Sequence, residues 1–359
     1  MPDLFSRNWS REQLLERLGD ISQIASVSQE ELASGPGRGM RQLSFRTGSG
    51  LSFAVLPDRG MDFAGADYRG IPLAWRSPTG WVAPSFYEPR GTGWLRSFGG
   101  GLMVTCGLTQ VGSPAVDGGE ELGQHGRISN IPAANVAVGA GWVGDDYVLK
   151  ASGNVREVSV YGHDLELRRT IETSLTAASV RIRDEIENRG TGIAPLMLLY
   201  HFNVGFPLVS ESANLVLPPC RSEARDPGTP LDGLRTFDAP MAGVAEQVFY
   251  HEPVRDSDEV CLALVNDHVL PDTELAFYLR YGRSALPYLV QWKHHGAGIN
   301  ALGLEPANCH VEGRPAERRR GTLQHLQPGE VVTTSIEWGV VEGSAQVDRL
   351  RERIASETR

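Results

Sequence analysis

The sequence has little positive charge, few lysines and no long hydrophobic run. Lys and Arg together number 34 against 44 for Asp and Glu, the net charge is −10, and the only lysines are Lys150 and Lys293. A chain this acidic is not expected to wrap nucleic acid or to bind anionic lipid. No apolar stretch reaches the ~18 residues of a membrane-spanning helix, and residues 1–7 lack the basic-then-apolar order of a signal peptide. We therefore expect a cytoplasmic protein without nucleic-acid or membrane partners.

The sequence also lacks the short motifs of common cofactor and metal sites. Its 4 cysteines form no Cys-x-x-Cys pair and are expected to be reduced thiols. It contains no Gly-x-x-x-x-Gly-Lys phosphate loop, no Gly-x-Ser-x-Gly nucleophile elbow and no His-Glu-x-x-His zinc motif. Gly99-Gly100-Gly101 resembles an esterase oxyanion loop, but without the elbow we interpret it as a tight turn.

Short strand-like runs separated by turn residues are abundant. The 41 glycines and 22 prolines are spread evenly along the chain, which is typical of many turns between short strands. A predicted hairpin joins residues 41–47 to residues 51–56 across Gly48-Ser49-Gly50. Further predicted strands cover residues 165–173, 180–187, 193–200, 260–265, 275–281, 288–292 and 331–341. Many strands without recurring helices predict an all-β fold, a large antiparallel sandwich.

Helical periodicity is confined to the two ends of the sequence. Residues 10–21 combine capping-box spacing with apolar residues at helical intervals, and residues 345–359 carry a similar apolar stripe. We therefore predict a single domain, 1–359, with a helical extension over 1–38 and a helix at the C-terminal end. The charged run at residues 317–320 is interpreted as a solvated surface.

Charged or titratable residues interrupt apolar or glycine-rich surroundings at four places. These are Pro57-Asp58-Arg59-Gly60-Met61-Asp62, Gln124-His125-Gly126-Arg127, Tyr200-His201-Phe202-Asn203 and Leu302-Gly303-Leu304-Glu305-Pro306. Glu305 follows a predicted core strand, where a carboxylate needs a partner to offset its desolvation. A lone histidine is more often a hydrogen-bonded core residue. Residues on separate strands can converge in space, so a metal site of His125, His201 and Glu305 is an alternative.

These blocks resemble the galactose mutarotase-like (aldose 1-epimerase) superfamily, and most closely its bacterial relatives known as domain of unknown function 4432. The resemblance is carried by Arg59-Gly60-Met61-Asp62, Gly100-Gly101-Leu102, Thr105-Cys106-Gly107-Leu108, His125-Gly126-Arg127-Ile128-Ser129-Asn130, Tyr200-His201-Phe202-Asn203, Gln291-Trp292-Lys293 and Leu304-Glu305-Pro306. It extends over nearly the whole chain. It implies a β-supersandwich with a sugar cleft across one sheet and short helices at the termini.

The same resemblance implies roles for individual residues. In mutarotases a glutamate late in the chain is the general base and a histidine is the general acid, and Glu305 and His201 match these positions. An early arginine and an early histidine bind sugar oxygens there, and Arg59 and His125 are the nearest matches. Mutarotases carry an Asn-Arg pair where this chain has His125-Gly126-Arg127, so the second match is approximate. Further substrate contacts are expected from Arg127, Asn203, Gln291, Trp292 and Lys293.

The expected chemistry is opening and closing of a cyclic sugar or sugar acid. Glu305 would remove the proton of the anomeric hydroxyl while His201, as imidazolium, protonates the ring oxygen. Unperturbed pKa values of about 4.3 for Glu and 6.5 for His give charges of the right sign for these roles. The reaction requires no cofactor, and its partner is a small-molecule carbohydrate.

Two other functions are compatible with these residues. One is a metal-assisted isomerase, epimerase or lyase, in which the same base takes a proton from a carbon beside the carbonyl. The other is a non-catalytic carbohydrate-binding protein. The oligomeric state is open as well, because the terminal helices either pack on the sandwich or cap a contact in a homodimer.

Overall fold

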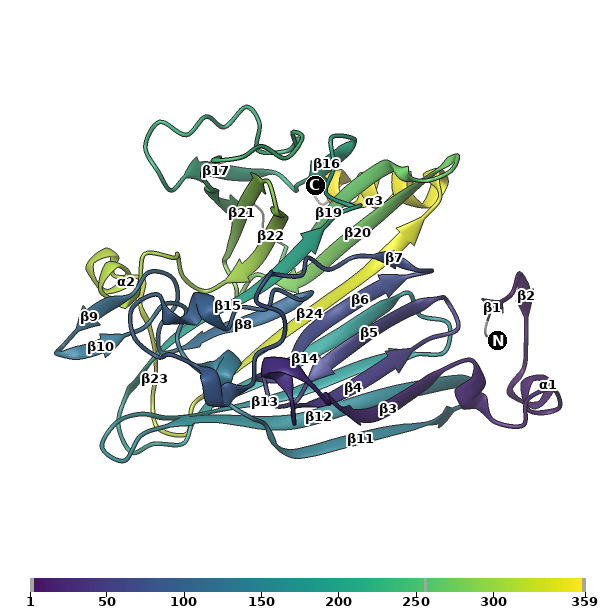
Figure 1. Cartoon of the computed structure of the whole chain (residues 1–359), viewed down its shortest axis with the longest axis horizontal. Helices are drawn as coiled ribbons and strands as arrows, with labels where there is room; N and C mark the ends of the chain where they lie inside the picture. Colours follow the sequence, from purple (N-terminus) through teal and green to yellow (C-terminus); the bar gives the residue numbers. More distant parts are fainter. Residues whose placement is uncertain (1–2, 255–256, 357–359) are drawn as a thin grey trace.

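Two large antiparallel sheets dominate the computed structural model, which describes residues 3–254 and 257–356 (Figure 1). The eight-stranded sheet has the order β11 (Ala134–Val143), β12 (Asp146–Val158), β13 (Asp164–Ser174), β14 (Ser179–Asn188), β24 (Val331–Glu342), β20 (Thr273–Gly282), β19 (Glu259–Leu270) and β16 (Ala213–Val216). The twelve-stranded sheet has the order β17 (Cys220–Ala224), β18 (Gln247–Pro253), β21 (Tyr288–Gly296), β22 (Ile299–Ala307), β15 (Ala194–Gly205), β8 (Met103–Leu108), β6 (Asp62–Tyr68), β5 (Leu51–Leu56), β4 (Arg41–Arg46) and β3 (Ser26–Glu31). Outside this order, β23 (Gln324–Leu326) pairs with β15 and β7 (Ile71–Pro72) pairs with β6. Two small hairpins are formed by β1 (Asp3–Leu4) with β2 (Arg7–Asn8) and by β9 (Ala115–Asp117) with β10 (Glu120–Leu122).

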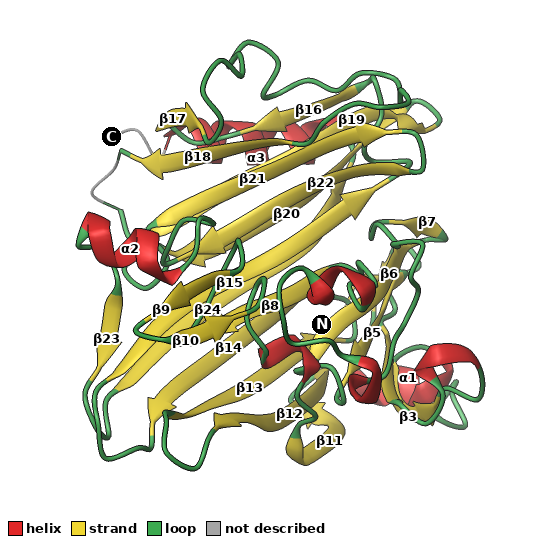
Figure 2. Cartoon of the chain, turned by 60° about the vertical axis from the view of Figure 1, so that its left-hand side comes forward, coloured by secondary structure: helices red, strands yellow, loops and turns green. Residues whose placement is uncertain are grey.

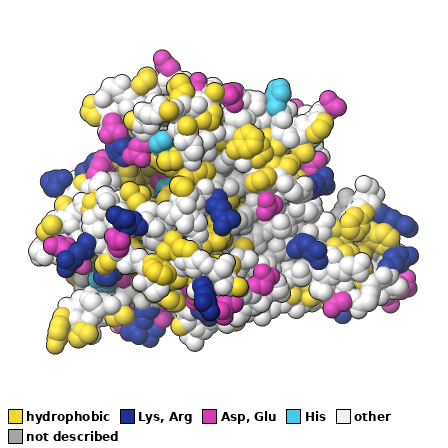
Figure 3. Space-filling model, in the orientation of Figure 1, with side chains coloured by type: hydrophobic (Ala, Val, Ile, Leu, Met, Phe, Trp, Pro, Cys, Tyr) yellow, Lys and Arg dark blue, Asp and Glu magenta, His cyan; other side chains and the backbone are white. Residues whose placement is uncertain are grey.

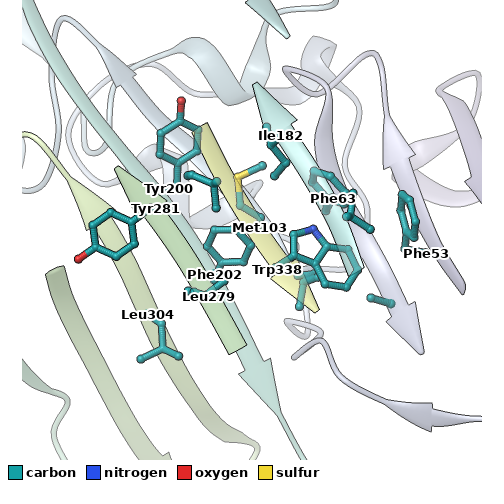
Figure 4. Packing of buried hydrophobic residues seen from close by; sticks show 14 of the residues in the cluster. Phe53, Phe63, Met103, Ile182, Tyr200, Phe202, Leu279, Tyr281, Leu304 and Trp338 are labelled. Carbon is teal, nitrogen blue, oxygen red and sulfur yellow. The ribbon is translucent and has the colours of Figure 1, made fainter. Parts of the chain in front are cut away.

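Alternating apolar residues turn one face of each sheet toward a shared core. Leu167 on β13 pairs with Ile186 on β14, and both are buried. Figure 4 shows how Trp338 of β24 meets aromatic rings of the other sheet, edge-on to Phe53 at 5.5 Å and to Phe63 at 5.7 Å. The predicted all-β antiparallel sandwich is confirmed, because period-two patterns bury one face of a strand.

A buried ionic network crosses this core. The guanidinium of Arg169 on β13 donates to the carboxylate of Asp184 at 2.6 Å and to that of Asp62 at 3.1 Å. The hydroxyl of Tyr200 donates to Asp184 at 2.7 Å, and Thr105 donates to Asp62 at 2.6 Å. These bonds tie β13 and β14 of one sheet to β15, β8 and β6 of the other.

The terminal helices form where the apolar stripes indicated, but the N-terminal one is short. The capping box predicted at Ser10 is present, yet α1 covers only Arg11–Leu15 and has Glu16 as its C-cap, and Asp20 then caps a separate 3-10 turn. The expected helical extension over 1–38 is therefore wrong in part, since β3 joins the twelve-stranded sheet by pairing with β4. Helix α3 (Ser344–Ser356) lies beside β19 (Figure 2), and its apolar stripe is buried against residues of β19 and β20, while residues 357–359 of the predicted helix lie outside the described residues.

A third helix was not predicted from the sequence. Helix α2 (Arg314–Arg320) begins after Gly313, whose φ is +90°, with proline in its first turn. The charged run at 317–320 is not a solvated surface throughout, because Glu317 is 1% exposed. Its carboxylate accepts hydrogen bonds from Arg320 at 2.8 Å and from the hydroxyl of Thr322 at 2.7 Å, which offset its burial.

Two further expectations concern thiols and membranes. All four cysteines are thiols outside any disulfide, as predicted. Within the described residues, every helix is too short or too polar to cross a lipid bilayer.

Candidate functional site

A cavity of about 240 Å³ lies over the outer face of the twelve-stranded sheet, on the side away from the sandwich core. Its lining includes His201 from β15, Glu305 from β22 and Trp292 from β21, together with His125 from the loop that follows β10. Figure 3 shows a recess on this face beside β21 and β22, with acidic, basic and histidine side chains around it. Four of the residues predicted from the sequence therefore meet in one cavity.

His201 and Glu305 touch one another at the floor of this cavity. The distance from Nε2 of His201 to Oε1 of Glu305 is 3.2 Å, and the side chains are 7% and 2% exposed. Adjacent strands hold them, because Phe202 of β15 pairs with Leu304 of β22. The glycine at 303 leaves room for the pair, since a Cβ there would lie 2.4 Å from Oε1 of Glu305.

Burial sets the protonation states of this pair. Desolvation, with the neighbouring His125 adding to it, lowers the pKa of His201 to about 3. Desolvation raises the pKa of Glu305 well above its usual value, an effect that Glu246 increases and Arg225 opposes. The expected imidazolium and carboxylate are thus corrected. Burial therefore favours the neutral form of each group, a protonated Glu305 carboxyl beside a neutral His201 imidazole.

Aromatic rings form the walls around the pair. The Trp94 ring lies 4.6 Å from that of His125, and the rings of Phe98 and Trp292 lie 5.5 and 5.7 Å from that of His201. Such faces suit the apolar side of a sugar ring. Because the backbone N–H of Gly112 donates to Nδ1 of His125, the hydrogen of a neutral His125 belongs on Nε2, which makes this atom a donor.

The rim of the cavity contains two charged residues that the sequence did not single out. Arg225, directly after β17, donates to Glu246 at 3.0 Å and to Asp226 at 2.8 Å. Glu246 also accepts from the indole N–H of Trp292 at 2.8 Å. No motif marks these residues. For Arg225 the available signal was the run of Pro, Arg and Asp over residues 218–240, a composition typical of a loop, whereas Glu246 lies beyond that run.

Five predicted substrate-binding residues lie outside the cavity lining. Arg59 is buried and donates to the backbone carbonyls of three residues: Ser129, Val82 and Ser97. Asn203 donates to the carbonyls of Gly101 and His201, and Arg127 is exposed on the surface.

Strand alternation explains the other two misplaced residues. Gln291 donates to the carbonyl of Leu234 at 2.7 Å, and Lys293 donates to that of Gly233 at 2.9 Å. Both lie on the face of β21 opposite to Trp292, because successive side chains of a strand point to opposite sides. Of the three consecutive candidates, only Trp292 can reach the cavity.

The metal alternative finds little geometric support. The rings of His125 and His201 are 5.9 Å apart. Among the described residues, three other side chains are close enough together to hold a metal ion. They are His310, Glu312 and Glu317, whose ligand atoms all lie within 4.8 Å of one another. Both carboxylates of that group already pair with Arg320.

Gly112 in the cavity wall offers a test of how tightly the site is packed. Its φ is +81°, and a Cβ would lie 1.9 Å from the carbonyl oxygen of Val311, which also lines the cavity. Gly112→Ala is expected to lower the melting temperature and to distort the wall. Gly118→Ala is the matched control, because Gly118 has φ +59° but no atom within 4 Å of its Cβ position. Equal melting temperatures for the two variants would contradict this prediction.

Comparison with known proteins identifies the architecture as that of galactose mutarotase-like proteins. A protein from Klebsiella pneumoniae with the provisional name aldose 1-epimerase is 25% identical, with a TM-score of 0.85 over 93% of this chain and 88% of that one. Galactose 1-epimerase from Lactobacillus acidophilus is 12% identical, with a TM-score of 0.57 over 89% of this chain and 100% of that one, a likeness of fold alone.

The sequence itself defines the family. The chain belongs to the family described as domain of unknown function 4432, whose model matches residues 37–340. No curated protein matches the sequence.

Proposed function

We propose that this protein is a carbohydrate-active isomerase that interconverts the anomers of a sugar, with Glu305 and His201 as its acid–base pair. The observation that supports this most is the 3.2 Å contact between two buried titratable groups at the floor of a cavity. The cavity volume of about 240 Å³ suits a small ligand such as one sugar ring.

The reaction needs one proton taken from the anomeric hydroxyl and one given to the ring oxygen. A pair in which Glu305 carries a proton and His201 is neutral can do both without any change in the charge of the site. With Glu305 as base and His201 as acid, this proton first crosses the 3.2 Å contact from Oε1 to Nε2. Sugar hydroxyls bound in the cavity favour that transfer, because they stabilise the ion pair in place of lost water. The open chain then rotates about C1–C2 and closes to the other anomer.

An uncharged sugar fits the rim better than a sugar acid. Arg225 is the cation of the cavity lining, and Glu246 and Asp226 already neutralise it. Neither Arg59 nor Lys293 reaches the cavity, since both donate to backbone carbonyls elsewhere. An anionic substrate would therefore bury its charge without a free cation beside it.

The direct test is NMR in deuterated water on a panel of aldoses, ketoses, uronates and sugar phosphates. We expect faster exchange between the anomers of an uncharged aldose, with no deuterium on carbon. Deuterium at the carbon beside the carbonyl would indicate an isomerase or epimerase, and a new ultraviolet-absorbing double bond would indicate a lyase. Saturable binding with no exchange for any sugar would indicate a binding protein.

The pKa shifts predict the pH dependence of exchange. The pair holds one proton above the lowered pKa of His201, about 3, and below the raised pKa of Glu305. Activity is therefore expected to persist as pH rises past 6.5 and to fall only as Glu305 loses its proton, since no acid then remains. Exchange rates measured by NMR from pH 4 to pH 9 test this. A fall centred on the ordinary histidine pKa would contradict it.

A further inference from the structure

A second hollow lies on the same outer face of the twelve-stranded sheet, over β4, β5 and β6. It encloses about 490 Å³ and is called here the β4–β6 groove. Its floor is small and polar, because alternation turns Gln42, Ser44, Ser52 and Asp67 outward while their neighbours face the core. Much of the surface over these strands in Figure 3 is accordingly neither apolar nor charged.

Two tryptophans form the walls of the β4–β6 groove, and the glycine triplet positions them. A Cβ at Gly99 would lie 2.7 Å from the Trp81 ring, and one at Gly100 would lie 2.9 Å from the Trp75 ring. The triplet at 99–101 is therefore more than a tight turn, since larger residues there would displace both walls. Two indole faces along a polar floor are a surface against which a sugar ring can stack.

Trp75 also separates the groove from the cavity described above. Its ring lies 5.9 Å from that of Trp292 and 5.8 Å from that of Phe98, and both of these line the cavity. The two hollows are thus neighbours on one sheet, with an aromatic partition between them.

Two charged side chains, Arg76 and Asp67, lie in the lining of the β4–β6 groove. The guanidinium of Arg76 lies 5.1 Å from the Trp81 ring, and no ion pair or side-chain hydrogen bond of the described residues involves it. The same holds for the carboxylate of Asp67, which is partly buried. Desolvation alone raises the pKa of Asp67, consistent with the lack of a cationic partner. The groove therefore offers donors and an acceptor to a ligand.

We infer that the β4–β6 groove is a second carbohydrate-binding site, separate from the catalytic cavity. Hydroxyl groups both donate and accept, so one sugar can bind the carboxylate of Asp67, the guanidinium of Arg76 and the serines of the floor. The apolar face of its ring stacks on Trp81. A zwitterionic amino acid would pair with the two charges but would leave the hydroxyl-rich floor unused.

The test uses the full chain with its 7 tryptophans labelled with ¹⁵N, titrated with the methyl glycosides of D-glucose and D-galactose. Methyl glycosides have no free anomeric hydroxyl, so they report binding without turnover. A saturable shift of the Trp81 indole resonance, assigned with Trp81→Phe, is expected. Asp67→Asn should weaken the binding that this resonance reports by about tenfold, because it removes a charge-assisted hydrogen bond. It should leave anomer exchange unchanged.

Asp267→Asn is the matched control, since Asp267 is exposed on another part of the surface. Arg76→Gln is a second variant, for use if Asp67→Asn does not fold. An unshifted Trp81 resonance, or equal binding by the Asp67 and Asp267 variants, would overturn the inference. A shift of the Trp81 resonance with free glycine but with neither methyl glycoside would overturn the inference as well. The readout is independent of catalysis, so absence of anomer exchange would leave this test intact.

Discussion

Glu305→Gln and His201→Asn are each expected to slow anomer exchange by ~10²–10⁴-fold, the usual contribution of a positioned acid or base. Because the two groups lie 3.2 Å apart and act in the same proton transfers, each variant disables the same pair. The double variant should therefore lose little more than the worse single one. Exchange rates by NMR on the preferred sugar measure all three.

Controls for these variants come from buried residues of the same types elsewhere. His251 is 1% exposed and bonds to Gln291 on the opposite face of the sheet, so His251→Asn tests the loss of a buried imidazole. Glu317→Gln does the same for a buried carboxylate. Both should retain exchange when folded, as judged by circular dichroism. Full activity in the Glu305/His201 double variant would end the assignment.

Arg169→Met is expected to cost about 3–5 kcal/mol of the free energy of unfolding. Arg169 has a fully buried side chain, and its loss leaves the carboxylates of Asp184 and Asp62 in the core without their cation. Two uncompensated buried charges are far less stable than a paired set. Urea denaturation, followed by the far-ultraviolet circular dichroism of the sheets, measures the change.

A surface arginine provides the comparison for this prediction. Arg156 pairs with Asp164 at 2.5 Å but is 48% exposed, so Arg156→Met should cost only ~0–1 kcal/mol. Replacing both acids as well, in Arg169→Met with Asp62→Asn and Asp184→Asn, should recover part of the stability. If Arg169→Met and Arg156→Met cost the same, the network does not stabilise the sandwich as described.

The sequence alone determined the fold class and several of the strands. The Gly48-Ser49-Gly50 turn, flanked by alternating apolar residues, predicted the hairpin of β4 and β5 within one residue of its observed bounds. The apolar run at 193–200 predicted a strand, and β15, which begins at Ala194, is buried almost throughout. These features are local, because turn chemistry and side-chain alternation are properties of consecutive residues.

Only the tertiary structure decided which candidate site residues meet in the cavity. Arg59 matched a family position yet donates to backbone carbonyls. Gln291 and Lys293 lie on the face of β21 that points away from the cavity. Arg225 and Glu246 lie at the cavity rim through the pairing of strands distant in sequence. The pKa values of His201 and Glu305 shift because of burial, which many separate segments produce together. Local patterns determine strands, whereas convergence and desolvation depend on contacts between residues that are far apart in the chain.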